Sequence, residues 1–537
     1  MINTELLNKG FKLAIEKNFD EANIIFDELI KDNPKDVSLL GMLSNLFIKT
    51  KQEEKAKDCL RKICDIKEDF STLSTLGKLE FFSKDYDKAA AYIEKAIKIK
   101  PDEVLYDMLI KAFCKLSLYA NAFHYAEEML ENYPDNIIAV TQMANCYTQM
   151  GKTFEAEQLC LDTLQKYPDS PTLWIQLGLL QETIYGNDAQ ALEFYQKALE
   201  VDPAKTTNAL YHIAVSYDRL DCFEKAVEYY KKFLDTNLNT PVTHSSLGMA
   251  YLRKKMFKEG YEHFFQRDIS KFSVEGHCKN LYNIGDKLED DILIACDQGL
   301  GDHLQFIRYL PLIKNKFKSI QVGCLPPLIK LFSENFPDIE FLKYTEIDTK
   351  KQAIRICDIP YIFNIDFDNI PSKDQYLDAK PADIKSDKLK IGICWEAGGV
   401  ALRGPLERTI NPKNLAPIFN MENIQLYSLQ LEDTFDALKD YPNIINLGKE
   451  FKNFSDTASA IKAMDAVICV DTSVLHLAGA LGVKTFLLLP YIADWRWFED
   501  TKTTPWYNSV ELFKQIDPIS WEKPVKDIIC RLKELSS

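Results

Sequence analysis

The segment DAVICVDTSVLHLAGALGVKTFLLLPYIADWRW, which runs from Asp465 to Trp497, decides the fold of the C-terminal half of the chain. Two continuous apolar runs, at 466–470 and 484–490, flank a run of small and apolar residues at 474–481. Strands that are buried on both faces of a parallel sheet are continuously apolar, and helices connect them. The segment therefore predicts a strand, a helix and a second strand of one parallel sheet.

Three short polar residues, Asp471, Thr472 and Ser473, stand where the first of these strands ends and the helix begins. Parallel sheets bind ligands at the carboxyl ends of their strands, beside helix N-termini. The same residue types also cap helices without binding a ligand. Taken alone, the segment leaves both a ligand site and a plain helix cap open.

Length, charge and cysteine content narrow the class of protein. The chain has 537 residues, too many for a single core, and its net charge of −15 disfavours binding to nucleic acid or anionic membranes. Its 13 cysteines include no C-x-x-C pair, which is typical of free thiols in a reducing cytosol. The first residues lack a signal-peptide pattern, and no apolar run approaches the ~20 residues of a transmembrane helix. We expect a cytoplasmic protein without an integral membrane segment.

A small residue recurs through the N-terminal half at spacings of 33 to 35 residues. A proline follows most of these positions twelve residues later, where it ends a helix because it lacks the N–H group and clashes with the preceding turn. The period resembles that of the tetratricopeptide repeat, a pair of antiparallel helices. The recurring residues are Ala22, Ala56, Ala89, Ala122, Ala156, Ala191, Ala226 and Gly260.

About eight such units extend over residues 1–270 and predict an α-solenoid, whose concave face binds extended peptides or helices. We therefore expect a protein partner in the repeat groove. The alternative is an array that only orients or dimerises the C-terminal half. Candidate groove residues, which fit a role as gap fillers between helices equally well, are Asn145, Tyr147, Tyr211, Tyr217 and Tyr251.

The second half of the chain alternates strands and helices. Residues 271–290 carry no helical period and are interpreted as a linker. Residues 291–375 and 388–520 are predicted to form two Rossmann-like lobes, and 521–537 a C-terminal helix. Neither G-x-G-x-x-G after the first strand nor G-x-x-x-x-G-K-[ST] occurs, so dinucleotide and P-loop chemistry are not indicated. The predicted fold class is an α-solenoid followed by a two-lobed α/β domain.

Four stretches of this half resemble the heptosyltransferase-like family of GT-B glycosyltransferases. They are Gly301-Asp302 within QGLGDHLQFIRYLPLI, the segment from Trp395 to Arg408, YSLQ at 427–430, and DTSVLHLAGALG from Asp471. The resemblance covers residues 290–520 and implies a GT-B fold. Joined to tetratricopeptide repeats, the domain is also similar in architecture to the O-GlcNAc transferases. The first lobe is shorter than the acceptor lobe of heptosyltransferases, so we expect the repeats to supply acceptor surface.

The resemblance implies a role for the residues of the Gly-Asp turn. Asp302 matches the family's catalytic base, which takes a proton from the acceptor hydroxyl. His303 is the local alternative, because its ordinary pKa suits proton transfer. Asp302 also fits a plain cap of a helix at 303–316. Gly301 lets the backbone approach the substrate closely.

The nucleotide-sugar donor is expected at the second lobe. Thr472 and Ser473 open a helix whose N-terminus would face the diphosphate, and Arg408 would neutralise it, with Arg403 as the fallback. Further implied donor contacts are Asp471, His476, Gln430 and Leu431. The possible sugar pocket consists of Gly301, Trp395, Asp494 and Trp495, the last two in a loop at 494–497 that is predicted to be exposed.

No DxD dyad flanked by strand residues is evident, so a mechanism without a metal or a cofactor is preferred. The hypothesis is an inverting transferase that moves a sugar from a nucleotide-sugar to a Ser or Thr hydroxyl of a protein held by the repeats. Two alternatives stay open. One is a transferase that acts on a glycan or a lipid-linked acceptor, and the other is a non-catalytic repeat scaffold.

Overall fold

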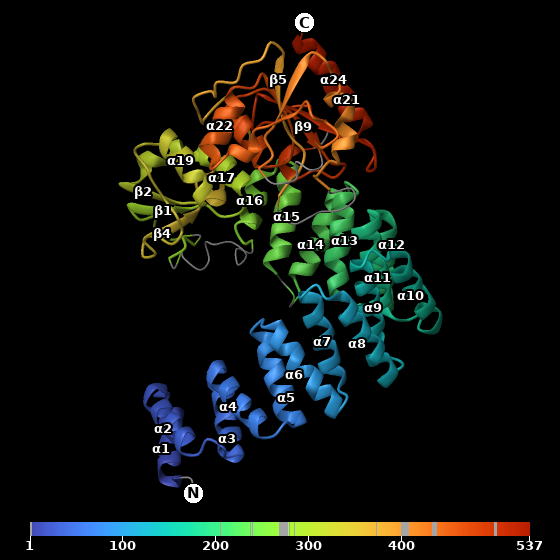
Figure 1. The fold of residues 1–537 in the computed structure, drawn as a ribbon, viewed down its shortest axis with the longest axis vertical. Coiled ribbons are helices and arrows are strands. Elements are labelled where there is room, and N and C mark those ends of the chain that lie inside the picture. Colours follow the sequence, from blue (N-terminus) through green and yellow to red (C-terminus); the bar gives the residue numbers. More distant parts are fainter. Residues whose placement is uncertain are drawn as a thin grey trace. The chain divides into compact units, whose positions relative to one another are not determined.

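The structure is a computed structural model (Figure 1). It describes residues 3–204, 206–236, 238, 240–267, 278, 280–283, 285–371, 373–398, 407–431, 438–498 and 502–536. Much of the linker predicted at 271–290 lies outside the described residues, as does Arg403. The chain divides into two compact units, Met1–Leu180 with Glu200–Lys205, and Gln181–Leu199 with Thr206–Ser537.

The N-terminal half folds as successive pairs of helices, as the repeat pattern predicts. The helices are α1 (Thr4–Ile15), α2 (Phe19–Asp32), α3 (Val37–Lys49), α4 (Glu53–Ile66), α5 (Phe70–Phe82), α6 (Tyr86–Ile99), α7 (Glu103–Lys115), α8 (Tyr119–Asn132), α9 (Ile137–Gln149), α10 (Thr153–Lys166), α11 (Pro171–Leu180), α12 (Asp188–Val201), α13 (Thr207–Arg219), α14 (Phe223–Leu234), α15 (Pro241–Arg253) and α16 (Phe257–Phe264). A π-helix, Gln181–Tyr185, directly follows α11.

The turn inside each pair has one backbone feature in common. A residue with positive φ ends the first helix, in the left-handed conformation that commonly terminates helices. It lies five positions before the buried small residue of the second helix, where the two helices touch. In the last pair, a Cβ added to Gly248 would lie 2.8 Å from the Gly260 carbonyl oxygen. The positive-φ residues are Lys17, Lys51, Lys84, Ser117, Gly151, Gly186, Asp221 and Lys255.

Two parallel sheets follow the repeats. Within the described residues, the first sheet has the order β3-β2-β1-β4 and the second the order β10-β9-β8-β5-β6-β7. The first sheet is made of β1 (Asp291–Ala295), β2 (Ser319–Gly323), β3 (Glu340–Leu342) and β4 (Gln352–Arg355). The second is made of β5 (Leu389–Cys394), β6 (Ile424–Ser428), β7 (Ile445–Asn446), β8 (Ala466–Val470), β9 (Thr485–Leu489) and β10 (Val510–Lys514).

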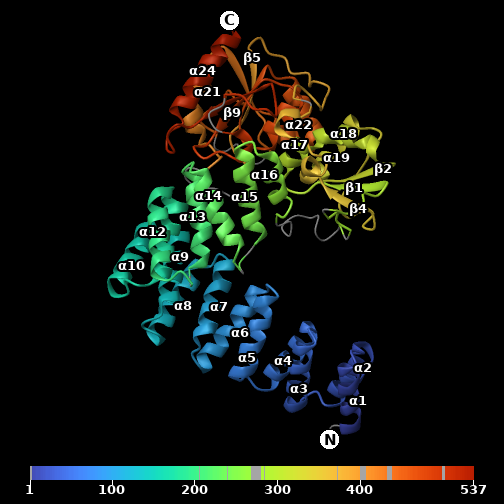
Figure 2. The same ribbon diagram turned by 180° about the vertical axis from the view of Figure 1, so that it is seen from behind.

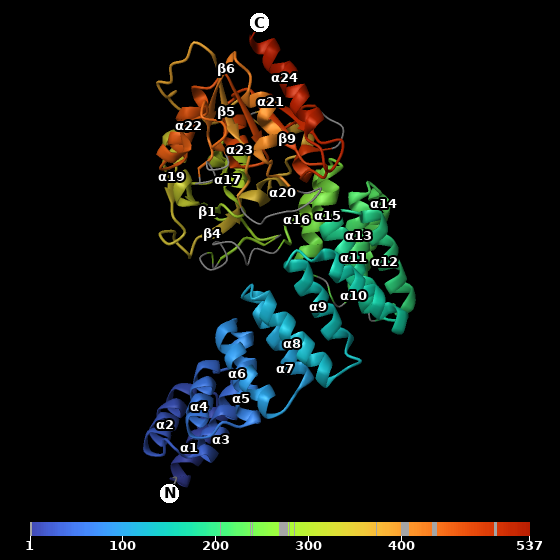
Figure 3. The same ribbon diagram turned by 45° about the vertical axis from the view of Figure 1, so that its right-hand side comes forward.

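The longer helices around these sheets are α17 (Leu300–Phe306), α19 (Pro326–Asn335), α22 (Phe454–Lys462), α23 (Ser473–Ala480) and α24 (Glu522–Ser536), and the short ones are α18 (Leu310–Ile313), α20 (Ile359–Ile362) and α21 (Ala416–Phe419). Figure 2 shows α24 beside α21, over the second sheet. Figure 3 shows α19 and α22 close together, where Ser455 Oγ donates a hydrogen bond to Glu334 Oε2 at 2.9 Å and so links the two sheets.

The helix predicted at 303–316 is wrong in its extent. It begins at Leu300 and gives way at Ile307 to a 3₁₀ turn, followed by α18 and a second 3₁₀ turn. Pro311 stands at the first turn of α18, where its missing N–H costs nothing, but it cannot donate to the carbonyl of Ile307 and so interrupts a continuous helix.

The last repeat is joined to the first sheet through a shared core. Phe257, Tyr261 and Phe264 of α16 belong to the same hydrophobic cluster as Ile292 and Phe306. Just beyond α16, the buried guanidinium of Arg267 pairs with Asp297, after β1, and with Asp358, after β4. Because an isolated buried charge is very costly, this network fixes the end of the repeats to the first sheet.

Candidate active site

The turn after β1 holds Asp302 in place. Gln298 has a φ of 72°, in the left-handed region, and Gly299 is the N-cap residue of α17. The Asp302 carboxylate accepts a hydrogen bond from the Gly299 N–H at 3.1 Å, so the capping role considered for this residue is present. Burial raises the pKa of Asp302 above its ordinary value, which strengthens the carboxylate as a base.

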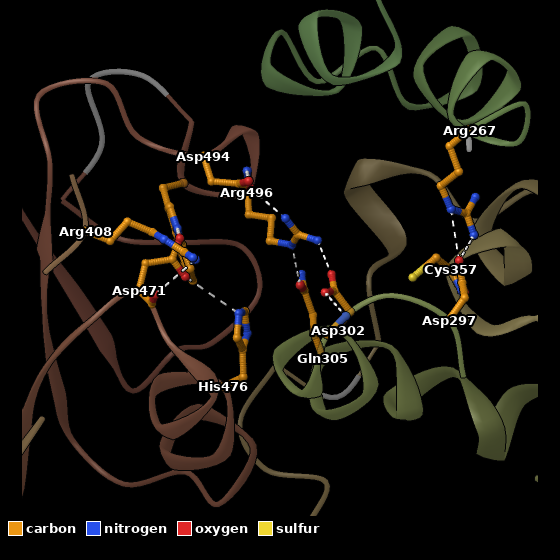
Figure 4. A network of polar contacts seen from close by, with 12 residues as sticks. Arg267, Asp297, Asp302, Gln305, Cys357, Arg408, Asp471, His476, Asp494 and Arg496 are labelled. Atoms are coloured by element: carbon orange, nitrogen blue, oxygen red, sulfur yellow. Dashed lines mark hydrogen bonds and ion pairs between the residues drawn. The ribbon is translucent and has the colours of Figure 1, made fainter. Parts of the chain in front are cut away.

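Arg496 binds Asp302 from the opposite sheet (Figure 4). Its NH2 group donates to Asp302 Oδ1, its Nε to Gln305 Oε1 at 2.8 Å, and its NH1 to Asp494 Oδ1 at 2.8 Å. The Arg496 side chain is only 13% exposed, so solvent screens this pair less than it screens a surface ion pair. Arg496 thus connects α17 with the segment that follows β9.

Helices α17 and α23 approach each other at Gly301. A Cβ added to Gly301 would lie 2.8 Å from Cδ2 of His476, a separation that real contacts essentially never show. Only glycine allows this approach. The His476 ring stacks on Trp497, and its Nδ1 lies 2.9 Å from the Tyr507 hydroxyl. Burial lowers the pKa of His476 well below its ordinary value, so the ring is neutral near pH 7.

His303, the alternative base, lies inside the first sheet's core. Its side chain is fully buried, and burial lowers its pKa to about 4. A neutral imidazole without solvent access is not placed to take a proton from a substrate. The structure therefore leaves Asp302 as the base candidate of this turn.

The start of α23 has no side-chain cap. Thr472 is the N-cap residue, but its hydroxyl makes no capping hydrogen bond, and both it and Ser473 are half-buried. The helix dipole at this end favours negative charge. Asp471 Oδ2 accepts a hydrogen bond from Trp497 Nε1 at 3.0 Å, and burial raises the Asp471 pKa to about 6.

A pocket of about 420 Å³ opens at the carboxyl ends of β8 and β9. Arg408, Asp471, Asp494 and Trp495, all predicted site residues, line one wall. Arg408 also donates to the Asp471 carbonyl oxygen at 3.3 Å, as Figure 4 shows. The opposite wall comes from the repeat helices α13, α14 and α15, and includes Tyr211.

Nine of the predicted site residues do not line this pocket: Gly301, Asp302, His303, Thr472, Ser473 and His476, described above, and Trp395, Gln430 and Leu431. Trp395 is buried in the core of the second sheet. The Gln430 side chain accepts from the Glu396 N–H at 3.3 Å and so joins the ends of β5 and β6. Leu431, next to it, is exposed.

The loop at 494–497 is not exposed, contrary to the prediction. Trp495 and Trp497 are fully buried. The Trp495 ring packs edge-to-face on Trp506 and on Tyr261 of α16, so large apolar surface is removed from water. A run of aromatic and charged letters after a strand does not distinguish an exposed loop from a buried turn.

The groove candidates serve different ends. Tyr211 reaches the pocket, whereas Tyr251 stacks on His263 and is buried. Tyr217 accepts a hydrogen bond from Gln196 Nε2 at 3.1 Å. In the compact unit that contains Met1–Leu180, Asn145 accepts a hydrogen bond from Gln176 at 2.8 Å, and Tyr147 packs on Phe123. Both residues therefore fill gaps between helices.

Several residues of the site carry no signal in the sequence. Gln305 lies one helical turn beyond Gly301, and Tyr507 precedes β10, a strand that sequence reasoning missed. Arg219 and Arg253 end repeat helices that are far from β8 along the chain. Their contribution depends on how the last repeats pack on the sheets, which local pattern does not reveal.

The comparisons with known proteins bear on the repeats. Models of the tetratricopeptide repeat match residues 117–177, and 37–70, 71–103 and 207–240. The chain therefore carries tetratricopeptide repeats, which confirms that prediction. A curated relative, Protein FlbA of Caulobacter vibrioides, is 23% identical over 456 residues, which cover 75% of this chain and 74% of FlbA.

Solved structures that match are repeat proteins. A tetratricopeptide repeat protein from Parabacteroides merdae is 16% identical, covers 46% of this chain and 98% of its own, and has a TM-score of 0.35. YrrB, described as having an unusual peptide-binding site, is 21% identical, covers 33% and 93%, and has a TM-score of 0.27. At these values neither carries an argument about function. Among the described residues, the helices are all too short or too polar to span a bilayer.

Proposed function

We propose that this chain is a metal-independent, inverting glycosyltransferase of the GT-B type. It moves a sugar from a nucleotide-sugar to a Ser or Thr hydroxyl of a protein that the repeats bind. The observation that carries the proposal is the position of Asp302 against the start of α23. Asp302 belongs to α17, beside the first sheet, and α23 belongs to the second sheet; the two helices meet where Gly301 lies against His476.

The proposed chemistry uses these residues in sequence. The acceptor hydroxyl oxygen forms a bond to the anomeric carbon of the sugar, and the bond from that carbon to the diphosphate oxygen breaks. The hydroxyl proton passes to the Asp302 carboxylate. The negative charge left on the diphosphate is stabilised by Arg408 and by the N–H groups that open α23. His476, neutral and held by Tyr507, supports Gly301 and the turn that carries Asp302.

The acceptor is proposed to be a protein because the repeats reach the site. Arrays of this kind present concave surfaces that bind peptides. Helices α13 to α15 form one wall of the pocket whose other wall holds Arg408 and Asp471. A peptide on the repeats would therefore have a short path to the donor.

One observation favours a second function, the non-catalytic scaffold. Asp302 already bonds the Gly299 N–H and Arg496, which leaves less of the carboxylate for a substrate proton. A scaffold would keep these contacts as structural ones.

Turnover distinguishes the two functions. The purified chain is incubated with UDP-, GDP- and ADP-sugars, nucleotide release is measured, and co-expressed candidate acceptors are weighed by intact-protein mass spectrometry. We expect one donor to be consumed and a defined mass to be added, both lost in Asp302→Asn. Absence of stabilisation by any nucleotide-sugar in a thermal-shift panel, together with absence of turnover, would establish the scaffold instead.

A further inference from the structure

The pocket beside Asp471 has a repeat wall with its own charged side chains. Asp218 and Arg219 are the last two residues of α13, and Arg253 is the last residue of α15. All of these residues belong to the compact unit that also contains both sheets. The repeats thus contribute polar groups directly to a pocket of the α/β region.

Arg219 faces the pocket with part of its guanidinium unused. Its NH1 group lies 3.3 Å from Glu182 Oε1 and 3.3 Å from Asp188 Oδ1, both buried carboxylates. Within the described residues, these contacts engage NH1 alone. The other N–H groups of this side chain, which is 19% exposed, have no partner among the residues that the structure describes.

Arg253 has a similar arrangement. Its NH1 group donates to Asp218 Oδ1 at 3.0 Å. Its Nε is buried and has no hydrogen-bond partner among the described residues. A buried donor without a partner costs free energy, so a bound acceptor at this place would be favoured.

The pocket's carboxylates, in contrast, already have partners. Asp218 pairs with Arg253, Asp494 with Arg496, and Asp471 accepts from Trp497 Nε1. The lining contains as many arginines as aspartates, so net charge alone does not attract an anion. Among the described residues, Arg253 Nε has no partner, and the contacts of Arg219 and Arg408 engage only their NH1 groups. Such groups recognise planar or tetrahedral oxyanions by paired hydrogen bonds.

The position of Arg219 is set by an irregular helix. Glu182 lies in the π-helix Gln181–Tyr185, in a repeat whose spacing is one residue longer than usual. Its carboxylate accepts from Tyr195 OH at 2.6 Å and bonds His212 Nδ1 at 3.1 Å. π-Helical insertions often occur at functional sites. Here the insertion places a buried carboxylate that holds Arg219 toward the pocket.

We propose that Arg219 and Arg253 of the repeats form, with Arg408, a subsite that binds an oxyanion of the ligand in this pocket. This inference rests on the proposed function, in which the ligand is a nucleotide-sugar. The oxyanion is then either a phosphate of the nucleotide or a carboxylate on the transferred sugar. The repeats accordingly bind the donor as well as the acceptor.

Binding measurements on the full chain test the subsite. Isothermal titration calorimetry is performed with inorganic pyrophosphate, with UDP, GDP, ADP and CMP, and with the pair UDP-glucose and UDP-glucuronate. The variants are Arg253→Gln and Arg219→Lys, the second of which keeps the charge beside Glu182 and Asp188. Lys232→Gln, which removes an exposed lysine paired with Glu228, is the matched control. Melting temperatures confirm that each variant is folded.

We expect both variants to weaken binding by about tenfold or more, as the loss of one charge-assisted hydrogen bond does, and Lys232→Gln to bind like the wild type. If the subsite binds a phosphate, both variants lose affinity for pyrophosphate and for a nucleotide. If the subsite binds a carboxylate of the sugar, the variants lose only the preference for UDP-glucuronate over UDP-glucose. Unchanged binding of every probe by folded variants overturns the inference, and so does a wild type that binds none.

The two proposals fail separately. If Arg408→Gln abolishes nucleotide binding while the two repeat variants bind every probe as the wild type does, with the same preference between UDP-glucuronate and UDP-glucose, the transferase proposal stands and the repeat subsite is wrong. If the repeat variants lose pyrophosphate binding but no nucleotide-sugar is turned over, the subsite stands and the transferase proposal is wrong.

Discussion

Arg496 donates a hydrogen bond to Asp302 across a separation of 194 residues along the chain. Asp302 lies in the first turn of α17, which follows β1, and Arg496 lies after β9 of the other sheet. The same guanidinium binds Gln305 and Asp494, so a single side chain joins α17 to the pocket wall. Any ligand that hydrogen-bonds to the Asp302 carboxylate must therefore bind next to the Arg496–Asp302 ion pair.

Replacing Asp302 by Asn should separate catalysis from helix capping. We expect kcat to fall by about 10²-fold to 10⁴-fold, because a general base contributes that much, while nucleotide binding is retained. Asp456→Asn is the matched control, since Asp456 is the third residue of α22 and accepts from the Asn453 N–H as Asp302 does from Gly299. Turnover rates and calorimetric nucleotide affinities of the two variants distinguish a catalytic role from a capping role. Equal losses in both variants would assign Asp302 a capping role only.

Replacing Arg496 by Met should destabilise the unit that contains the sheets. Removal of one partner of a buried ion pair leaves the other charge unpaired and costs about 3–5 kcal/mol. Urea unfolding followed by tryptophan fluorescence measures the change. The double variant Arg496→Met with Asp302→Asn should lose less than the sum of the single variants. Strict additivity would show that the pair contributes no coupling energy.

Gly301→Ala should disturb the contact between α17 and α23. The new methyl group would lie 2.8 Å from His476 Cδ2, and overpacking of this kind costs about 1–3 kcal/mol. Gly41→Ala, on α3, is the control, because nothing lies within 4 Å of its added Cβ. There we expect a gain of about 0.5–1 kcal/mol from helix propensity. Melting temperatures that shift in the same direction would contradict the close approach at Gly301.

Asp471→Asn should change how stability depends on pH. The folded-state pKa of Asp471, about 6, lies above its unfolded value, so the folded chain holds the proton more tightly. The free energy of unfolding therefore falls as pH rises through about 4 to 6. Asn removes this loss and still accepts from Trp497, so the variant should melt higher than the wild type at pH 7.5 and no higher at pH 4.5.

Glu511→Gln provides a comparison of opposite sign. The Arg531 guanidinium holds the pKa of Glu511 at about 2, with Lys484 adding to the shift, so its ionised form stabilises the fold at neutral pH. That stability is lost as pH falls from the unfolded pKa toward 2. Calorimetric melting at pH 7.5 should show a lower melting temperature for Glu511→Gln and a higher one for Asp471→Asn. A shared direction would refute the assignment for Asp471.

Truncation should show that the last repeats and the sheets fold as one unit. A chain that starts at Gln181 keeps α13 to α16 and should fold, as judged by circular dichroism and a cooperative melt. A chain that starts after Arg267 loses Phe257 and Tyr261 from the shared core and removes Arg267 from Asp297 and Asp358. We expect the second chain to be insoluble. If the two truncated chains were equally soluble, the inference that α16 and the first sheet share one core would be wrong.

Much of the fold can be predicted from the sequence because its elements have a clear period. The repeats follow a strict spacing, and the apolar runs that became β1, β2, β5, β8 and β9 were recognisable. β4 and β10 were missed because their runs are short or mixed with charged residues, such as Glu511. The interruption near Pro311 also needs the tertiary setting to be resolved.

The candidate site was predicted in part. Asp302 and Asp471 follow β1 and β8, where position in a βα unit indicates function, whereas Arg408 was indicated by the resemblance to a known family. Arg496 could not be paired with Asp302 from the sequence, because nothing in either segment shows that two different sheets face each other there. The repeat arginines were missed for the same reason, as the packing of α13 and α15 against the sheets is a long-range property.

The shared core of α16 and the first sheet has a consequence for how such chains diverge. Substitutions in helices before Leu180 alter a unit with its own interior, so partner preference can drift there without repacking the sheets. Substitutions at Phe257 or Tyr261 require compensation in both elements. Across homologues, the early repeats should therefore be exchanged and lengthened freely, while the last repeats are inherited together with the sheets as one block.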